Sequence, residues 1–213
     1  MNGYLVGQLI KDGYLKTKPI IEVFKKIKRA DFLPEETVSE KGKDFIANYN
    51  APLPIGYQQT ISQPLTVAFM LELLQPAEGD KILDIGAGSG WQTAMLCQIV
   101  GPNGFVYAIE RIPELKEFGQ KNVEKYDFGQ AEFICGDGSK GLAAKAPFDK
   151  IIAAAAAEEI PQSWKEQLKI GGRLVSPAGN SIWLLIRKDK DKFEEKEHPG
   201  FVFVPLISKP FAK

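Results

Sequence analysis

Apolar residues near the N-terminus recur three or four positions apart, which is the spacing of a helix. They form two stretches: Leu5, Leu9 and Ile10, and then Ile20, Ile21, Phe24 and Ile27. Such spacing places apolar side chains on one helix face. Pro19 suits the first turn of the second helix, where the missing N–H of proline has no partner to lose. The pattern predicts a helical preface that extends to about residue 47.

Residues 48–59 interrupt this periodicity. Prolines and a glycine in this stretch break regular structure, so we expect an ordered surface loop. The next helix should begin at Ser62, whose hydroxyl can cap it, with Pro64 in the first turn. Its buried face would consist of Val67, Ala68, Leu71 and Leu74.

Beyond Gly79, short apolar runs alternate with stretches of helical character. The predicted strands are Lys81–Ile85, Phe105–Ile109, Ala131–Cys135, Lys150–Ala154 and Arg173–Val175. The predicted helices are Trp91–Val100, Pro113–Tyr126 and Pro161–Leu168. Parallel strands need long crossover connections, which helices supply. The alternation therefore predicts an α/β protein whose parallel sheet carries helices on both faces.

The C-terminal part has a different pattern. Ile182–Arg187 and Phe201–Leu206 are typical of strands, and no helical stretch lies between them. The charged run Lys188–Glu197 joins them and is expected to be a solvated loop. The two strands should form an antiparallel edge of the sheet.

Length and charge limit the possible partners. The chain has 213 residues, which suits a single domain. Its 27 Lys and Arg residues balance its 27 Asp and Glu residues, which disfavours nucleic acid and anionic membranes, since both attract basic surfaces. The longest apolar runs, such as Ile151–Ala157, are much shorter than the roughly 20 residues of a membrane span. The N-terminus lacks the pattern of a signal peptide, so we expect a cytoplasmic protein.

The two cysteines, Cys97 and Cys135, lack the spacing of metal ligands. In a cytoplasmic chain they are expected to be reduced thiols rather than a disulfide. No metal site is predicted.

The strongest local signal is a glycine-rich loop after the first predicted core strand. Gly86, Gly88 and Gly90 follow this strand and open a helix at Trp91. Glycines there allow a sharp turn and the close approach of a ligand. Glu110 ends the next strand, where a carboxylate can accept hydrogen bonds from both hydroxyls of a ribose. These residues predict a nucleoside site.

The surroundings of this loop favour one nucleoside over another. A dinucleotide loop reads Gly-x-Gly-x-x-Gly, whereas here alternate positions are glycine. Asp84 before the loop would repel a phosphate but suits an ammonium group, and S-adenosylmethionine carries an ammonium group and a ribose without phosphate. Asp137, flanked by Gly136 and Gly138 after the third strand, is placed to accept from an adenine amino group. A turn that uses its glycines only for packing remains an alternative.

Strings spread along the chain match one family in order. The most discriminating is Pro52–Pro64, PLPIGYQQTISQP. The others are Phe32–Glu35, Glu110–Glu114, Gly136–Gly138, Ala146–Asp149, Glu159–Pro161, Gly171–Val175 and Phe203–Leu206. The chain thereby resembles the protein-L-isoaspartate O-methyltransferases, repair enzymes that methylate isoaspartyl residues.

The resemblance implies a fold and a division of the chain. The fold would be a Rossmann-like class I methyltransferase, with a doubly wound, mostly parallel sheet, an antiparallel C-terminal edge and a helical N-terminal preface. Residues 1–213 would form one domain. Within it, residues 1–58 would be the preface and substrate-side loop, and residues 59–213 the cofactor-binding core.

The resemblance also implies the site residues. The cofactor S-adenosyl-L-methionine would be bound by Gln59, Thr60, Ile61, Ser62, Asp84, Ile85, Gly86, Ala87, Gly88, Ser89, Glu110, Arg111, Gly136, Asp137 and Gly138. Ser62 would be the catalytic residue. The chain departs from the family pattern at Asn50-Ala51, Leu65, Val202 and Ala153–Ala157, which border the family's peptide groove. We expect these departures to affect substrate preference more than chemistry.

The expected reaction is methyl transfer to the free carboxylate of L-isoaspartyl, and also D-aspartyl, residues in damaged proteins. That carboxylate has a pKa near 4 and is already ionised at neutral pH, so no catalytic base is needed. This agrees with the sequence, whose one histidine, His198, has no catalytic partner nearby. Ser62 would align the acceptor carboxylate, although a serine at a helix start is also a good cap.

Other functions remain open. The acceptor could be another carboxylate or a small molecule. From different classes come an NAD-dependent oxidoreductase and a non-catalytic nucleoside-binding module. The bacterial-type members of the family favour a monomer.

Overall fold

The computed structural model describes residues 3–208. Its helices are α1 (Gly3–Lys11), α2 (Lys18–Lys26), α3 (Glu35–Lys41), α4 (Lys43–Asn48), α5 (Pro64–Leu74), α6 (Trp91–Val100), α7 (Pro113–Glu124) and α8 (Gln162–Gln167), with the short 3-10 helices η1 (Arg29–Phe32), η2 (Gly138–Lys140) and η3 (Ala143–Lys145). Its strands are β1 (Leu53–Gly56), β2 (Gln59–Ile61), β3 (Lys81–Ile85), β4 (Phe105–Glu110), β5 (Ala131–Cys135), β6 (Phe148–Ala153), β7 (Leu168–Ala178), β8 (Ser181–Asp189) and β9 (Lys192–Pro199).

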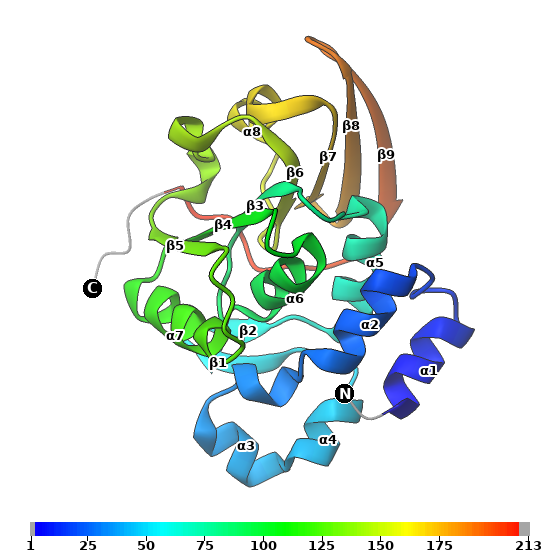
Figure 1. The fold of residues 1–213 in the computed structure, drawn as a ribbon, viewed down its shortest axis with the longest axis vertical. Coiled ribbons are helices and arrows are strands. Elements are labelled where there is room, and N and C mark those ends of the chain that lie inside the picture. Colours follow the sequence, from blue (N-terminus) through cyan, green and yellow to red (C-terminus); the bar gives the residue numbers. More distant parts are fainter. Residues whose placement is uncertain (1–2, 209–213) are drawn as a thin grey trace.

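The strands from β3 onward form one sheet, in the order β5-β4-β3-β6-β7-β8-β9 (Figure 1). Neighbouring strands from β5 to β7 run parallel. β8 pairs antiparallel with β7, and β9 pairs antiparallel with β8. The predicted α/β class and the antiparallel C-terminal edge are both confirmed.

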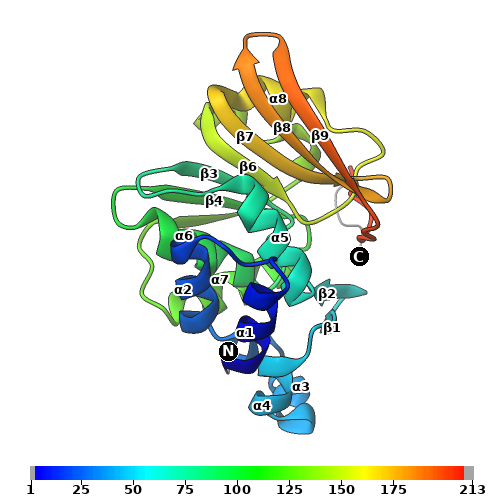
Figure 2. The same cartoon turned by 90° about the vertical axis from the view of Figure 1, so that its right-hand side faces the viewer.

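Side chains of the central strands alternate between two hydrophobic clusters, because successive residues of a strand point to opposite faces of the sheet. Ile82 of β3 belongs to a cluster that also contains buried residues of α1, α2, α5 and α6. Leu83 belongs to a second cluster that includes Trp164 of α8. Figure 2 shows α1, α2, α5, α6 and α7 gathered to one side of the sheet and α8 to the other. The helical preface and the sheet therefore share a continuous core.

The predicted preface helices are confirmed as α1 and α2, with Pro19 in the first turn of α2. Phe24 of α2 is fully buried, and its ring meets Trp91 edge to face at a centroid distance of 5.8 Å. Ile10, expected on the apolar face of α1, is 41% exposed, and Val6 takes a buried position on that helix instead. The preface thus packs directly against the helix that follows the glycine loop.

Residues 48–59 were expected to form a loop, but they contain strand β1 and the first residue of β2. β1 lies within this stretch, and β2 begins at its last residue and extends beyond it. The two strands form an antiparallel hairpin, and its turn residues Tyr57 and Gln58 both have left-handed backbone conformations. Leu53 and Ile55 are buried while Pro54 between them is exposed. This period-two pattern was obscured by the prolines, which are tolerated in a short edge ribbon because they need not donate to a ladder.

The charged run near the C-terminus was wrongly expected to be a loop. Residues 192–199 form β9, which returns along β8 after a tight turn at Lys190 and Asp191. The strand is exposed, so its charges stay in water, and Lys188 pairs with Glu194 across the hairpin at 2.7 Å. The predicted strand Phe201–Leu206 makes only an isolated bridge, between Pro205 and Ala156.

The remaining core elements follow the prediction closely, and the bounds of β3, β5 and α6 match it. β7 is much longer than the predicted residues 173–175. Cys97 is buried and Cys135 is exposed, and both are free thiols, as expected. Within residues 3–208, no helix combines the length and apolar character that crossing a membrane requires.

Candidate active site

A pocket opens at the carboxyl ends of the parallel strands, where ligands of open α/β sheets bind. The predicted site residues that line it are Gln59, Thr60, Ile61, Ser62, Ile85, Gly86, Ala87, Gly88, Ser89, Glu110, Arg111, Gly136 and Gly138. Of the predicted set, only Asp84 and Asp137 lie outside its wall. Residues far apart in the sequence are thus brought around one cavity.

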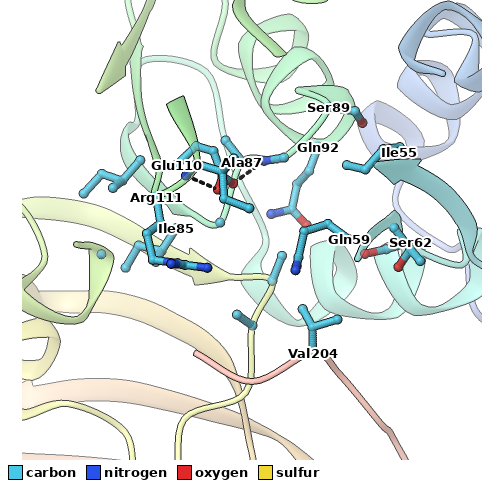
Figure 3. Close-up of a pocket in the computed structure, with 18 of the residues that line it drawn as sticks. Ile55, Gln59, Ser62, Ile85, Ala87, Ser89, Gln92, Glu110, Arg111 and Val204 are labelled. Carbon is cyan, nitrogen blue, oxygen red and sulfur yellow. Dashed lines mark hydrogen bonds between the residues drawn. The ribbon is translucent and has the colours of Figure 1, made fainter. Parts of the chain in front are cut away.

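The pocket has two distinct ends (Figure 3). Glu110, Arg111 and Ala87 lie on one side, and we call these residues with Gly86 and Gly88 the glycine-loop end. Ser89 lies on the side of Ile55. Gln59 and Ser62 lie on the other side, and we call residues 59–62 with Ile55 the hairpin end. Gln92 lies between the two ends.

Backbone hydrogen bonds hold the glycine loop to the next strand. The amides of Gly86 and Ala87 donate to the carbonyl of Ile109 at 2.8 and 3.1 Å. Gly90 has a φ of +84°, and a Cβ there would lie 2.6 Å from the carbonyl oxygen of Gly119 in α7. The third glycine therefore serves the packing of the loop against α7, whereas Gly86 and Gly88 face the pocket.

Glu110 completes the glycine-loop end. Its side chain is buried, and its two carboxylate oxygens accept from the amides of Gly88 and Ile112, each at 2.9 Å. A carboxylate oxygen has two lone pairs, so each oxygen keeps one for a further donor. The geometry suits two neighbouring hydroxyls, as the sequence predicted for a ribose.

Asp84 was expected to meet the ligand's ammonium group, but its carboxylate is fully buried beneath the pocket. It accepts hydrogen bonds from Gln92 Nε2 at 2.8 Å and from Thr93 Oγ1 at 2.6 Å. Burial raises the pKa of Asp84 to about 6, against the opposing effect of these two bonds. At neutral pH the group is thus mostly ionised and acts on the pocket through its neighbours.

Gln92 is a pocket residue that the sequence reasoning missed. Its Nε2 donates to Asp84, so the amide oxygen is the end left for a ligand. An amide oxygen backed by a buried carboxylate attracts a cation such as an ammonium group. A usable signal existed, since Gln92 follows the glycine loop in the first turn of α6.

Asp137 lies just outside the pocket wall. Its Oδ1 accepts from the amide and the hydroxyl of Ser139, at 2.9 and 2.7 Å, and so caps η2. The carbonyl of Gly138 accepts from Trp164 Nε1 at 2.8 Å. These bonds fix the backbone of residues 136–138 beside the pocket, and the side chain of Asp137 stabilises the start of η2.

Ser62 at the hairpin end is not the cap of α5. The helix begins at Pro64, its N-cap is Gln63, and the Gln63 side chain caps no backbone amide of the first turn. Instead, Asn50 Oδ1 accepts from the amide of Leu65 at 3.0 Å. Within residues 3–208 the hydroxyl of Ser62 makes no hydrogen bond, so it is available to a ligand. The predicted buried face of α5 is confirmed.

Apolar residues make up most of the wall that sequence reasoning missed. They are Ile55, Val67, Trp91, Ile109, Ile112, Val204, Pro205, Leu206 and Ile207. Ala154 and Ala155, which were expected at the border of the peptide groove, also line the pocket. Leu206 N donates to Ala156 O at 2.7 Å, and Ala156 N donates to Val204 O at 2.8 Å. These two bonds bring the C-terminal segment against the pocket. The sequence pattern predicts a strand there and contains the family string Phe203–Leu206, but none of residues 204–207 is among the predicted site residues.

The sheet order, the glycine loop and the acidic strand end define a Rossmann-like methyltransferase of the α/β class. The family model for protein-L-isoaspartate(D-aspartate) O-methyltransferase matches residues 1–210. The chain therefore belongs to the protein-L-isoaspartate(D-aspartate) O-methyltransferase family.

Individual relatives agree with this family. Protein-L-isoaspartate O-methyltransferase of Methanopyrus kandleri is 39% identical over 208 residues, which cover 95% of this chain and 89% of the relative. That of Aeropyrum pernix is 44% identical over 208 residues, which cover 95% of this chain and 78% of the relative. Both alignments span the preface and the sheet.

Solved structures show the same fold. A protein-L-isoaspartate O-methyltransferase structure superposes with a TM-score of 0.85 at 26% identity, and the match covers 96% of this chain and 65% of that chain. A Plasmodium falciparum chain assigned to this activity, in complex with S-adenosyl-L-homocysteine, gives a TM-score of 0.81 at 19% identity, covering 97% and 98% of the two chains.

Proposed function

We propose that this enzyme transfers the methyl group of S-adenosyl-L-methionine to the free carboxylate of L-isoaspartyl, and also D-aspartyl, residues in proteins. The observation that carries the proposal is the two-ended pocket. The carboxylate of Glu110 faces one end, and the unengaged hydroxyl of Ser62 faces the other. In a chain of this family, the first end suits a nucleoside cofactor and the second suits a carboxylate acceptor.

The donor set of the pocket fits the cofactor. Glu110 would hold the ribose hydroxyls, and the amide oxygen of Gln92, backed by Asp84, would hold the ammonium group. Buried Ile85, Ile109 and Ile112 offer apolar surface to an adenine ring. When bound, S-adenosylmethionine supplies an electrophilic methyl group on a sulfonium centre.

The residues of the hairpin end would orient the acceptor. The hydroxyl of Ser62 would donate a hydrogen bond to one acceptor oxygen and leave the other free to attack the methyl group. No residue needs to remove a proton, because the acceptor carboxylate is ionised at neutral pH. Ile55 and Val204 help to exclude water from the cavity. Orientation and desolvation can together lower the barrier substantially.

The deciding experiment follows transfer of labelled methyl to three synthetic peptides that differ only in carrying L-isoaspartate, D-aspartate or L-aspartate. We expect base-labile label in the isoaspartyl peptide, weaker label in the D-aspartyl peptide and none in the third. If no peptide is labelled while S-adenosylhomocysteine still binds, the acceptor is a different carboxylate or a small molecule, or the chain is a binding module. Binding of NADH in place of S-adenosylhomocysteine would support an oxidoreductase instead.

We further propose that the chain acts as one domain and as a monomer in the cytoplasm, on protein rather than nucleic acid. The zero formal net charge supports the choice of partner. The hydrophobic cluster shared by preface and sheet supports the single domain. Light scattering at several protein concentrations tests the monomer, and a single unfolding transition in urea tests the single domain.

A further inference from the structure

Arg29 is a buried charge that no acidic side chain neutralises. It lies in η1 and is 1% exposed, and no salt bridge joins it to another side chain in the part of the chain that the structure describes. A buried guanidinium is costly unless its N–H groups are hydrogen-bonded.

The guanidinium of Arg29 binds backbone carbonyls on two separate segments. Nη1 donates to Tyr49 O at 2.8 Å, and Nη2 donates to Ala51 O at 2.7 Å and to Ser62 O at 3.0 Å, with a longer contact to Ile61 O at 3.4 Å. One segment precedes the hairpin and the other follows it. The planar fork of an arginine can bridge them, whereas a lysine offers a single nitrogen.

The same guanidinium also touches the wall of the pocket. Its central carbon lies 5.6 Å from the ring centre of Trp91, which lines the pocket from the first turn of α6. Trp91 is buried and packed against Phe24 of the preface. Arg29 therefore ties the hairpin end to the rigid helix that follows the glycine loop.

The bond from Arg29 is the only hydrogen bond that Ser62 makes within residues 3–208. Without it, Ser62 would have no hydrogen bond of its own, and the turn between β2 and α5 would be held through Asn50, which accepts from the Gln63 side chain and from the Leu65 amide. The direction of the Ser62 hydroxyl would then no longer be fixed relative to the pocket.

We propose that Arg29 is a positioning residue for the methyl acceptor. It holds the Ser62 backbone so that the hydroxyl faces the reacting carboxylate. This role rests on the proposed function and extends it to the helical preface, which contributes no residue to the pocket wall before Ile55. Loss of the fork should reduce turnover and leave cofactor binding nearly intact, because the glycine-loop end has its own hydrogen bonds.

The test compares Arg29→Lys and Arg29→Gln with a matched control, Arg187→Lys. The Arg187 guanidinium also donates to four backbone carbonyls, those of Glu166, Leu168, Asp189 and Lys190, but it lies on β8 and not at the pocket. Substitution of either arginine should lower the free energy of unfolding. Only the Arg29 variants should change the kinetics.

We expect kcat with the isoaspartyl peptide to fall at least about tenfold in both Arg29 variants, with the Kd for S-adenosylhomocysteine changed less than about threefold. Arg187→Lys should keep its kcat and its Kd. Arg29→Gln removes the buried charge and so keeps the comparison possible if Arg29→Lys does not fold.

Two results would overturn the proposal. In the first, the folded Arg29 variants lose only stability and keep wild-type kcat, which would make the residue merely structural. In the second, kcat and cofactor affinity fall together, which would place its effect at the glycine-loop end. A wild-type protein that labels no peptide in the same assay would instead overturn the proposed function, and this proposal with it.

Discussion

The glycine-loop end of the pocket comes from one short run of sequence and the end of the next strand, whereas the hairpin end is assembled from distant segments. Asp84 and Ile85 lie on β3, which pairs with β4, and the loop 86–90 that follows is held by hydrogen bonds to Ile109 and to the Glu110 carboxylate. Ile61 and Ser62 are bound by Arg29, and Gln63 beside them by Asn50, both from earlier in the chain. The same pocket is lined by residues 204–207 from near its end.

Under the proposed function, this difference separates cofactor binding from acceptor recognition. A change at the hairpin end can alter the acceptor without disturbing the backbone that holds the nucleoside. Of the departures from the family pattern, Asn50, Leu65 and Val202 lie on the hairpin side or next to the C-terminal segment, whereas Ala154 and Ala155 lie beside Gly86. Variants at each end should therefore have distinct kinetic signatures.

The largest effect is expected at the glycine-loop end, from Glu110→Ala. The variant removes a charged acceptor from two backbone amides and from the ligand, and hydrogen bonds to charged groups contribute about 1.5–3 kcal/mol each. S-adenosylhomocysteine should bind about 300-fold more weakly in calorimetry. Glu132→Ala, on the exposed face of the next strand, is the control and should bind normally. An unchanged Kd in Glu110→Ala would show that the nucleoside lies elsewhere.

Asp84 makes the same end sensitive to pH. Its pKa is raised by burial to about 6 in the folded protein, against about 3.9 in an unfolded chain. Between these values the unfolded chain releases its proton first, so the stability contributed by Asp84 below pH 4 is lost as pH rises through 6. The loss is about 3 kcal/mol.

Asp84→Asn should remove this pH dependence. Urea unfolding between pH 4 and pH 7 would measure it as the difference between the variant and the wild-type protein. Because an ammonium ligand favours the ionised carboxylate, cofactor binding by the wild-type protein should also weaken below about pH 6. Parallel pH profiles for the two proteins would contradict this account of the site.

Ser62→Ala tests the hairpin end. Loss of one hydrogen bond to the acceptor carboxylate should reduce kcat about 30-fold and leave the Kd for S-adenosylhomocysteine within about threefold. Unfolding free energy should change by less than about 0.5 kcal/mol, because Ser62 does not cap α5. Ser62→Asp should reduce turnover further by repelling the acceptor.

Ser181→Ala is a control in β8, where the Ser181 hydroxyl donates to Glu197 of the edge strand β9. It should keep full turnover. Should Ser62→Ala lose about 1 kcal/mol of stability and keep its kcat, the serine would be structural after all.

The smallest effect sharpens the boundary between the two ends. Gln92→Met removes the amide oxygen that lies between them and should weaken cofactor binding about tenfold, with kcat at saturating cofactor nearly unchanged. Thr93→Val removes the other hydrogen bond to Asp84, at a residue that does not line the pocket. It should cost stability and leave the Kd close to that of the wild-type protein. Equal weakening in both variants would mean that Asp84, rather than the Gln92 oxygen, determines affinity.

Sequence patterns predicted the parallel sheet well because each strand and helix carries its own periodicity. The loop at residues 86–90 and the acid at 110 were also found, since their chemistry follows from local spacing. The hairpin β1–β2 was missed because prolines masked a period-two pattern of two buried residues. The strand β9 was missed because a run of charged residues is as typical of an exposed edge strand as of a solvated loop.

A carboxylate in the sequence does not by itself show whether the side chain lines the pocket or lies beneath it. Asp84 and Glu110 have the same functional group and similar positions at strand ends, yet one is sealed beneath the pocket and the other lines it. The difference arises from α6, whose Gln92 and Thr93 cover Asp84. Gln92, in the first turn of that helix, lines the pocket in place of Asp84.

The sequence by itself determined the α/β class, the residues of the glycine-loop end and, through the strings it shares with relatives, the family. These features depend on local periodicity and on short motifs, which act through neighbours in the chain. Only the tertiary structure decided that Ser62 is free of the helix cap, that Gln92 faces the pocket and that Arg29 anchors the hairpin end. Such roles depend on which carbonyls, amides and carboxylates from distant segments are buried together, and that is fixed by packing.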